Sequence, residues 1–204
     1  PNPIDPREKT FFLPSNKVIL GSFAGTETDF SQRTKAVIDA NPSTLSGDLG
    51  TPNDYSDNSY HVVMVINETE AALFDGFTIV GGNANGVGNL VIGPATISRK
   101  FGGAYMSANS AGRIENCTFS DNKAIYAAGF YNHYGRQSII NCSFTNNAAD
   151  STGGGIFNFY SSPSISQSTF MNNSAPKFGG GGIGNFASSP TIDKCIFESN
   201  TGYQ

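Results

Sequence analysis

Paired carboxylates would be the first sign of an enzyme that cleaves glycosidic bonds, because such enzymes hold two carboxyl groups about 5 to 9.5 Å apart. Glu115 and Asp193 occupy equivalent positions of a sequence repeat. They stand three repeat units apart, and the units between them carry Ile140 and Ser166 at that position. The pattern therefore indicates no acid pair, and we predict no catalytic residues in this chain.

His61 and His133 are the chain's two histidines. Neither has a Ser or Cys nucleophile at a recognisable motif spacing, which a nucleophile and base pair would require. Both are therefore interpreted as packing or surface residues.

Aromatic residues are a better indication of a contact surface. Tyr131 and Phe157 each follow a residue predicted to point inward, so strand alternation turns them outward, and Tyr134 and Tyr160 form a second column nearby. Exposed aromatic rings stack on sugar rings or anchor a partner protein. We expect these four residues to contact a glycan or a host or cell-surface ligand; the alternative is a ladder of rings that shields the backbone.

Oxygen ligands are dense between residues 48 and 58, as they would be in a calcium site. This stretch holds Asp48, Asn53, Asp54, Asp57 and Asn58. Calcium takes 6–8 oxygen ligands, but the spacing does not match the twelve-residue EF-hand loop. Two interpretations stay open, a solvated loop and a Ca²⁺ site, and no other cofactor is indicated.

The charge pattern excludes two classes of partner. Charged residues make up 14% of the chain, the net charge is −4, and no run of like charge occurs. Nucleic-acid binding needs a basic patch, and a membrane-spanning helix needs about 18 or more consecutive apolar residues. The sequence has neither, so we expect no nucleic-acid partner and no membrane span.

The second half of the chain repeats with a period of 25 to 27 residues. Four phenylalanines mark the repeat, each is followed three residues later by Asn, and Ile precedes each by five residues. The phenylalanines are Phe119, Phe144, Phe170 and Phe197. A repeat of this length without helical periodicity is typical of a solenoid.

Each repeat must bend between its inward residues. Ile114 and Cys117 are an odd number of residues apart, so a turn at Asn116 is needed to bring both inward, and Asn tolerates the left-handed backbone of such a corner. Short strands joined by Gly and Asn corners predict an all-β parallel β-helix with coils of about 25 to 27 residues.

Stacked coils place like residues about 4.8 Å apart, so each column becomes a ladder. The predicted ladders are the four phenylalanines above, the amides Asn132, Asn158 and Asn185, and the thiols Cys117, Cys142 and Cys195. The thiols are interpreted as buried and unpaired, with a Cys117–Cys142 disulfide and a metal site as alternatives.

One domain is expected over residues 1–204, with irregular coils in 1–100 and regular repeats in 101–204. A surplus of about 15 residues predicts an inserted loop near 83–100 that leaves the solenoid body. The chain lacks a starting Met and ends soon after the last Phe-x-x-Asn motif, so it is expected to be a fragment of a longer protein. The solenoid ends should contact a second copy or further coils of the same protein.

Gly102-Gly103-Ala104-Tyr105 and Phe119-x-x-Asn122, with three looser copies, resemble the repeats of polymorphic outer-membrane proteins and of large secreted bacterial surface proteins. The stretch from Gly21 to Thr28 is similar to the N-terminal part of such domains. The resemblance implies a right-handed β-helix, exported and displayed at the bacterial outer membrane or outside the cell, that serves adhesion or acts as a structural stalk. The alternative is a polysaccharide-binding or polysaccharide-degrading domain, because the same fold carries polysaccharide lyases.

Overall fold

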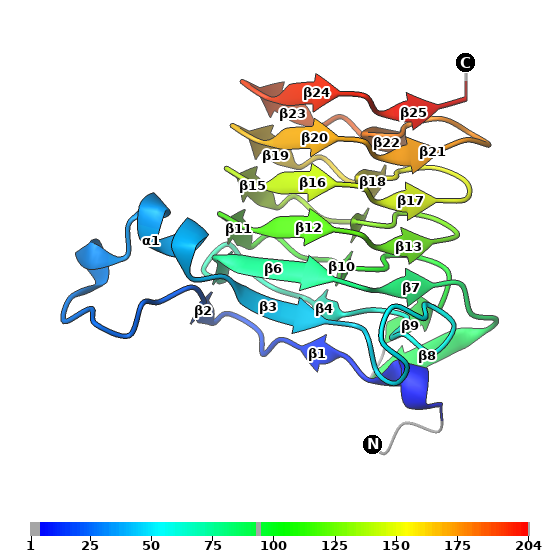
Figure 1. The fold of residues 1–204 in the computed structure, drawn as a ribbon. Helices are drawn as coiled ribbons and strands as arrows, with labels where there is room; N and C mark the ends of the chain where they lie inside the picture. Colours follow the sequence, from blue (N-terminus) through cyan, green and yellow to red (C-terminus); the bar gives the residue numbers. More distant parts are fainter. Residues whose placement is uncertain (1–4, 93–94, 204) are drawn as a thin grey trace.

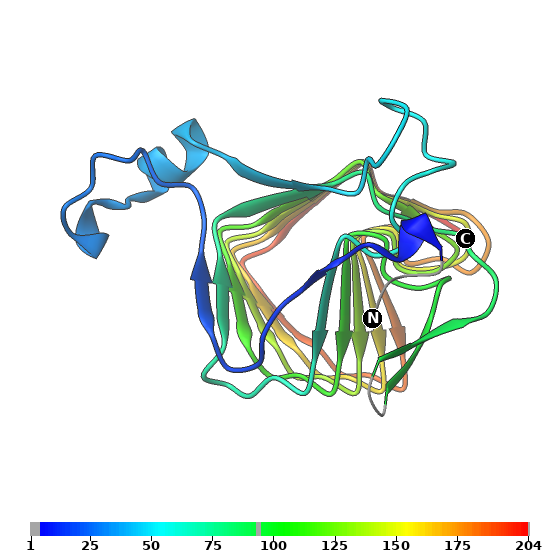
Figure 2. The same cartoon turned by 90° about the horizontal axis from the view of Figure 1, so that it is seen from below.

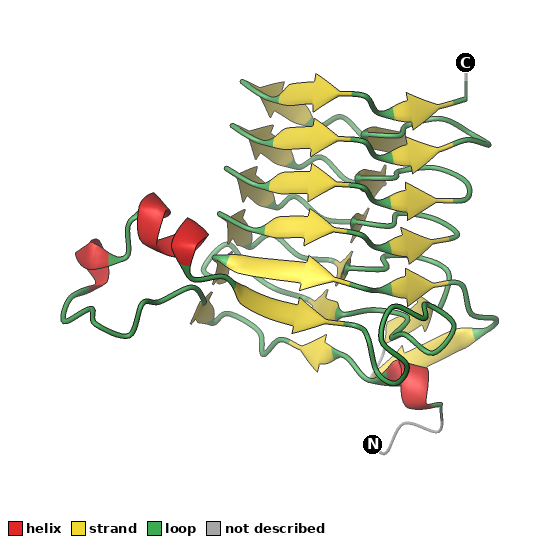
Figure 3. Cartoon of the chain, in the orientation of Figure 1, coloured by secondary structure: helices red, strands yellow, loops and turns green. Residues whose placement is uncertain are grey.

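The computed structural model describes residues 5–92 and 95–203, and it shows coils of short strands stacked along one axis (Figures 1 and 3). Four parallel sheets, A to D, run along this stack, because each coil contributes one strand to sheets A, B and C, and each coil after the first contributes one to sheet D. The all-β parallel β-helix that the repeat predicts is therefore confirmed.

The strands of each sheet follow one another in coil order. Sheet A contains β1 (Phe11–Phe12), β4 (Val63–Ile66), β10 (Tyr105–Ala108), β14 (Phe130–His133), β18 (Ile156–Phe159) and β22 (Ile183–Phe186). Sheet B contains β2 (Val18–Leu20), β5 (Leu73–Asp75), β11 (Arg113–Glu115), β15 (Ser138–Ile140), β19 (Ser164–Ser166) and β23 (Thr191–Asp193).

Sheet C contains β3 (Ser43–Ser46), β6 (Phe77–Val80), β12 (Thr118–Ser120), β16 (Ser143–Thr145), β20 (Thr169–Met171) and β24 (Ile196–Glu198). Sheet D contains β7 (Asn83–Ala84), β13 (Lys123–Ala124), β17 (Ala148–Ala149), β21 (Ser174–Ala175) and β25 (Thr201–Gly202). Outside the coils lie the hairpin β8 (Asn89–Ile92) and β9 (Ala95–Ser98), the helix α1 (Lys35–Ala40), and the 3-10 helices η1 (Pro6–Glu8) and η2 (Phe30–Gln32).

The core is a set of side-chain ladders. The rings of Phe119, Phe144, Phe170 and Phe197 stack with centroids 4.6, 4.9 and 4.7 Å apart and nearly parallel planes. Inward amides form a second ladder, in which Asn132 donates to Asn158 and Asn158 to Asn185. The three cysteines carry free thiols, two of them buried.

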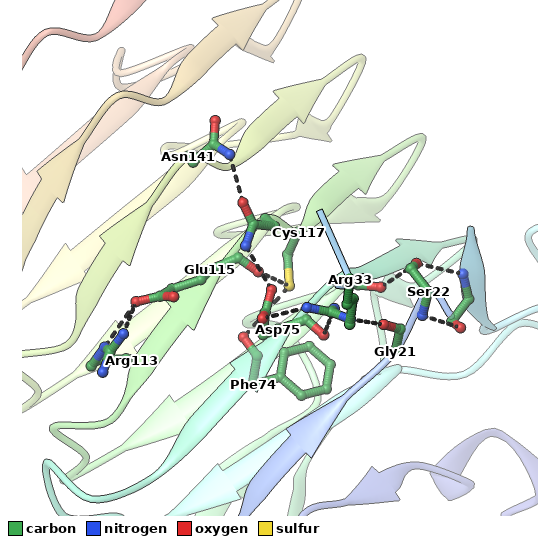
Figure 4. Close-up of polar contacts among 12 residues, drawn as sticks. Gly21, Ser22, Arg33, Phe74, Asp75, Arg113, Glu115, Cys117 and Asn141 are labelled. Atoms are coloured by element: carbon green, nitrogen blue, oxygen red, sulfur yellow. Dashed lines mark hydrogen bonds and ion pairs between the residues drawn. The ribbon is translucent and has the colours of Figure 1, made fainter. Parts of the chain in front are cut away.

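The corner between sheets B and C turns through left-handed residues, as the odd spacing requires. Asn116 and Asn141 have φ values of 51° and 53°, and the Asn141 amide donates to Oδ1 of Asn116 at 2.6 Å. Asn116 in turn donates to Asp75 at 2.8 Å, and the buried Arg33 pairs with Asp75 at 2.8 Å (Figure 4). This ion pair fixes the long excursion of residues 22–42 to the coil stack.

The insertion expected near residues 83–100 contains the hairpin β8–β9, which lies beside sheet A outside the coils (Figure 2). Ile97 of the hairpin is buried against the outward side chains Met64 and Met106 of sheet A. Arg99 forms an ion pair with Glu8. The insertion therefore covers the first coils of this sheet face.

Candidate functional site

A groove runs across the corner between sheets A and B, and the lengths of the corner loops explain why it forms. The β4–β5 corner, residues 67–72, is longer than the β10–β11 corner, residues 109–112, and the β14–β15 corner, residues 134–137. The longer loop projects as one wall. The β10–β11 corner consists of the small residues Asn109, Ser110, Ala111 and Gly112, so it lies low and forms the floor.

The opposite wall carries Tyr134, Arg136 and Tyr160 from the next two coils. The groove is open to solvent and has a volume of about 650 Å³, which is within the range of roughly 300–1,000 Å³ that small-molecule sites occupy. Its remaining lining comes mainly from Glu68, Thr69, Glu70 and Ala71. We call this site the corner groove.

Tyr134 and Tyr160 occupy a backbone position that suits neither of them. Their φ values are 52° and 50°, and in the coil below the same left-handed position holds Asn109, with φ 51°. Asn accepts this conformation readily, whereas a bulky side chain there is strained. Strain of this kind is concentrated at functional sites, which directs attention to the two tyrosines.

The two tyrosine rings form a short stack with one open side. Their centroids are 5.3 Å apart and their planes differ by 13°. Tyr160 also meets the edge of Phe186 at 5.7 Å, so both of its sides have aromatic neighbours. Below Tyr134 the column continues with Asn109, which has no ring, so the side of Tyr134 away from Tyr160 borders the groove. The His133 ring is its other aromatic neighbour, 4.5 Å away and tilted by 52°, and Tyr134 stays 55% exposed.

Three charged side chains complete the lining. Arg136 and Glu70 form an exposed ion pair at 3.9 Å. Glu68 is half-buried, and burial raises its pKa to about 7, because removing water from a carboxylate disfavours the charged form. At neutral pH Glu68 can therefore either donate or accept a proton.

Of the four aromatic residues predicted to contact a ligand, the structure places Tyr134 and Tyr160 in the groove and exposes both. Tyr131 and Phe157 do point away from the core, but our expectation that they are exposed is wrong, since they are only 6% and 8% exposed. They pack into a second apolar cluster outside sheet A, where Phe101 lies 4.7 Å from Tyr131. Strand alternation gives the face of a sheet, but not what covers that face.

The loop predicted as a calcium site largely satisfies its own oxygens. One carboxylate oxygen each of Asp48, Asp54 and Asp57 accepts a backbone N–H of the same loop at 2.8 to 3.0 Å. Oδ1 of Asp57 and Oδ1 of Asn58 are buried without a donor, and both are oxygens of the kind that Ca²⁺ takes as ligands, while Asn53 lies at an exposed turn. In residues 5–92 and 95–203 no cluster of three or more acidic, His or Cys side chains has metal-binding geometry. Calcium stays a prediction.

Neither acid of the sequence pair lies in the groove. Glu115 pairs with Arg113 on the outside of sheet B (Figure 4), and Asp193 lies 3.7 Å from Lys194. His61 is fully buried, and desolvation lowers its pKa to about 4. His133 packs among aromatic rings, 4.5 Å from Tyr134.

Sequence reasoning missed Glu68, Glu70 and Arg136. The signal that could have found them is the number of residues between the strands of sheets A and B, which is larger in the Glu68 coil than in the later coils. That count requires strand boundaries, and the repeat is too irregular before residue 101 to supply them.

A family model described as "Right handed beta helix region" matches residues 55–204. No curated protein and no solved structure matches this chain. In the described part of the chain no helix is long and apolar enough to cross a membrane.

Proposed function

Because the chain belongs to the right-handed β-helix family, we propose that it is a rigid, non-enzymatic module, displayed on the outside of a bacterial cell, that binds glycans in the corner groove. The family gives the fold alone, since one fold hosts many functions.

One observation carries the proposal: the open ring face of Tyr134 in a groove lined by polar groups. A pyranose ring has an apolar face and hydroxyl groups around its edge. Such a ring can stack on an aromatic face while its hydroxyls meet Asn109, Glu68 and Arg136. The strained backbone of Tyr134 supports the same conclusion, because Asn would fit the position without that cost.

Stacked ladders support a structural role. The last four coils stack a Phe ring on the next, and the inward amides are joined from coil to coil, so a bound ligand meets preformed walls. A preformed site loses little conformational entropy on binding. This suits a module that holds a ligand in place.

A second candidate function is polysaccharide cleavage, and the pKa of Glu68 favours it. A carboxyl group with a pKa of about 7 can serve as a general acid, and Glu70 supplies a second carboxyl in the same groove. The Arg136 ion pair already engages Glu70. We favour binding, because nothing else in the described groove resembles a catalytic base.

The test is a binding survey of neutral, acidic and amino-sugar oligosaccharides, with Tyr134→Ala as the groove variant. Tyr203→Ala is the matched control, since Tyr203 is an exposed tyrosine outside the groove. We expect the wild type and the control to bind and Tyr134→Ala to lose at least tenfold in affinity, because the substitution removes both the stacking face and its apolar contact area. Release of reducing or unsaturated ends from any oligosaccharide would contradict a non-enzymatic role and support polysaccharide cleavage.

We also propose that further coils or a second copy pair with β22–β25. These strands have a hydrogen-bonded neighbour on one side in the described structure, and Ile192, Ile196 and Phe197 are exposed there. Unpaired strand edges with apolar side chains are templates for another chain. Light scattering of this chain at increasing concentration tests pairing with a second copy, and a monomer at every concentration would contradict that pairing.

A further inference from the structure

We propose that the corner groove selects sugars that carry a free, positively charged amine. This inference rests on the proposed glycan-binding function and names the class of sugar that the groove prefers.

The charges of the groove do not balance. Glu70 and Arg136 neutralise each other across 3.9 Å. Glu68 has no ion-pair partner among residues 5–92 and 95–203, and no described donor bonds its carboxylate. Glu68, whose pKa is raised to about 7 by burial, is therefore left with a partial negative charge at neutral pH, which a cationic ligand would stabilise and match.

The backbone holds Glu68 against the floor of the groove. Its N–H donates to Oγ of Ser110 at 3.1 Å, and its carbonyl accepts the N–H of Ala111 at 3.0 Å. A Cβ built on Gly112 would lie 3.1 Å from Oε2 of Glu68, so the carboxylate occupies space that a side chain at residue 112 would take. The carboxylate is thus positioned before any ligand arrives.

The open face of Tyr134 favours the same kind of ligand. The face of an aromatic ring is negative and attracts cations, by about 0.5–1 kcal/mol at exposed sites. A protonated amine on a sugar that stacks in this groove would meet the ring face and the Glu68 carboxylate together, whereas an N-acetyl group offers no charge to either. The preference follows from two groups on facing walls.

Five groups face the bound sugar and can carry or change charge: Glu68, Glu70, Arg136 and the phenols of Tyr134 and Tyr160. Burial raises the pKa of the Tyr105 phenol, and the charge of Glu68 raises it further. Arg136 is the one cation among them, and its pairing with Glu70 limits its repulsion of an amine.

The experiment compares β-1,4-linked glucosamine trimers with and without N-acetyl groups by titration calorimetry at pH 7 and low salt. We expect the free amine to bind wild-type protein about tenfold more tightly. Glu68→Gln should lose most of this difference while it keeps its affinity for the acetylated trimer. Glu198→Gln makes the same substitution in sheet C, at a residue that does not line the groove, and should therefore keep the full difference.

Equal affinity for the two trimers would overturn the amine preference and leave the glycan groove intact. No binding of either trimer or of any surveyed oligosaccharide would instead remove the proposed function. If tetramethylammonium competes as well as the glucosamine trimer, the sugar ring contributes nothing and the assignment to amino sugars fails. Retention of the amine preference by Glu68→Gln would also overturn it.

Discussion

The rings of Tyr134 and Tyr160 stack 5.3 Å apart on successive coils, and both residues hold a left-handed backbone that Asn109 adopts in the coil below. The backbone of this position favours Asn over Tyr, so the two tyrosines are explained by ligand binding rather than by folding stability. The rings lie where a ligand can reach them, and the backbone is strained in order to place them there.

Replacement of Tyr134 by Asn tests this explanation. A bulky residue in a left-handed conformation costs about 1–3 kcal/mol, and Asn avoids much of this cost. Loss of the ring stacking removes about 0.5–1.5 kcal/mol of stability and offsets part of that gain. We expect the free energy of unfolding, measured with urea, to stay level or to rise by about 1 kcal/mol. A fall of more than about 1 kcal/mol would show that the tyrosine is there for packing.

The pKa of Glu68 predicts a pH dependence of stability. Its pKa is about 7 in the folded protein and near 4.5 in an unfolded chain, so between these values the folded state binds more protons and loses stability as the pH rises. Because the side chain is only half-buried, we expect a loss of about 1 kcal/mol after solvent screening. Glu68→Gln should match the wild type at pH 4 and exceed it by that amount at pH 8.

The difference between the two proteins is the quantity to measure, because His61 acts in the opposite direction. Its pKa is lowered to about 4, so its contribution to stability is lost as the pH falls from about 6.5 towards 4. This contribution is common to both proteins and cancels. A pH-independent difference between them would contradict the assignment to Glu68.

The phenylalanine ladder predicts a large core effect. Phe144 is completely buried between the rings of Phe119 and Phe170, so Phe144→Ala should cost about 3–5 kcal/mol of unfolding free energy. Phe197 is 48% exposed and stacks on one ring, so Phe197→Ala should cost clearly less. Equal losses at the two positions would show that the ladder is not what stabilises the coils.

Calcium at residues 48–58 remains to be tested. If an ion bonds the buried oxygens of Asp57 and Asn58, a chelator should lower the melting temperature and added Ca²⁺ should restore it, because a ligand of the folded state stabilises that state. Asp57→Asn should mimic the chelator. An unchanged melting temperature at millimolar Ca²⁺ would leave a loop closed by its own hydrogen bonds.

The fold could be predicted from the sequence because its physical cause repeats. Stacking at one coil spacing makes Phe119 lie on Phe144 and Asn132 on Asn158, so a single column of like residues reports both the neighbour and the inward face. The turn at Asn116 followed from the odd spacing of inward residues in the same way.

The site was less predictable because its causes do not repeat. Tyr131 was expected to be exposed, and it is buried in an apolar cluster with Phe101, a contact between segments that no column encodes. Glu68 reaches the groove because one corner loop is longer than the others, in a coil where the repeat is weak. Such features depend on tertiary neighbours, which one sequence does not display.

The affinity of Tyr134→Ala for the best-bound oligosaccharide, relative to wild type and to Tyr203→Ala, tests the central claim most directly. The corner groove predicts at least a tenfold loss in Tyr134→Ala alone, with all three proteins equally folded by circular dichroism. Unchanged affinity in Tyr134→Ala would contradict the claim and place any glycan binding elsewhere on the molecule.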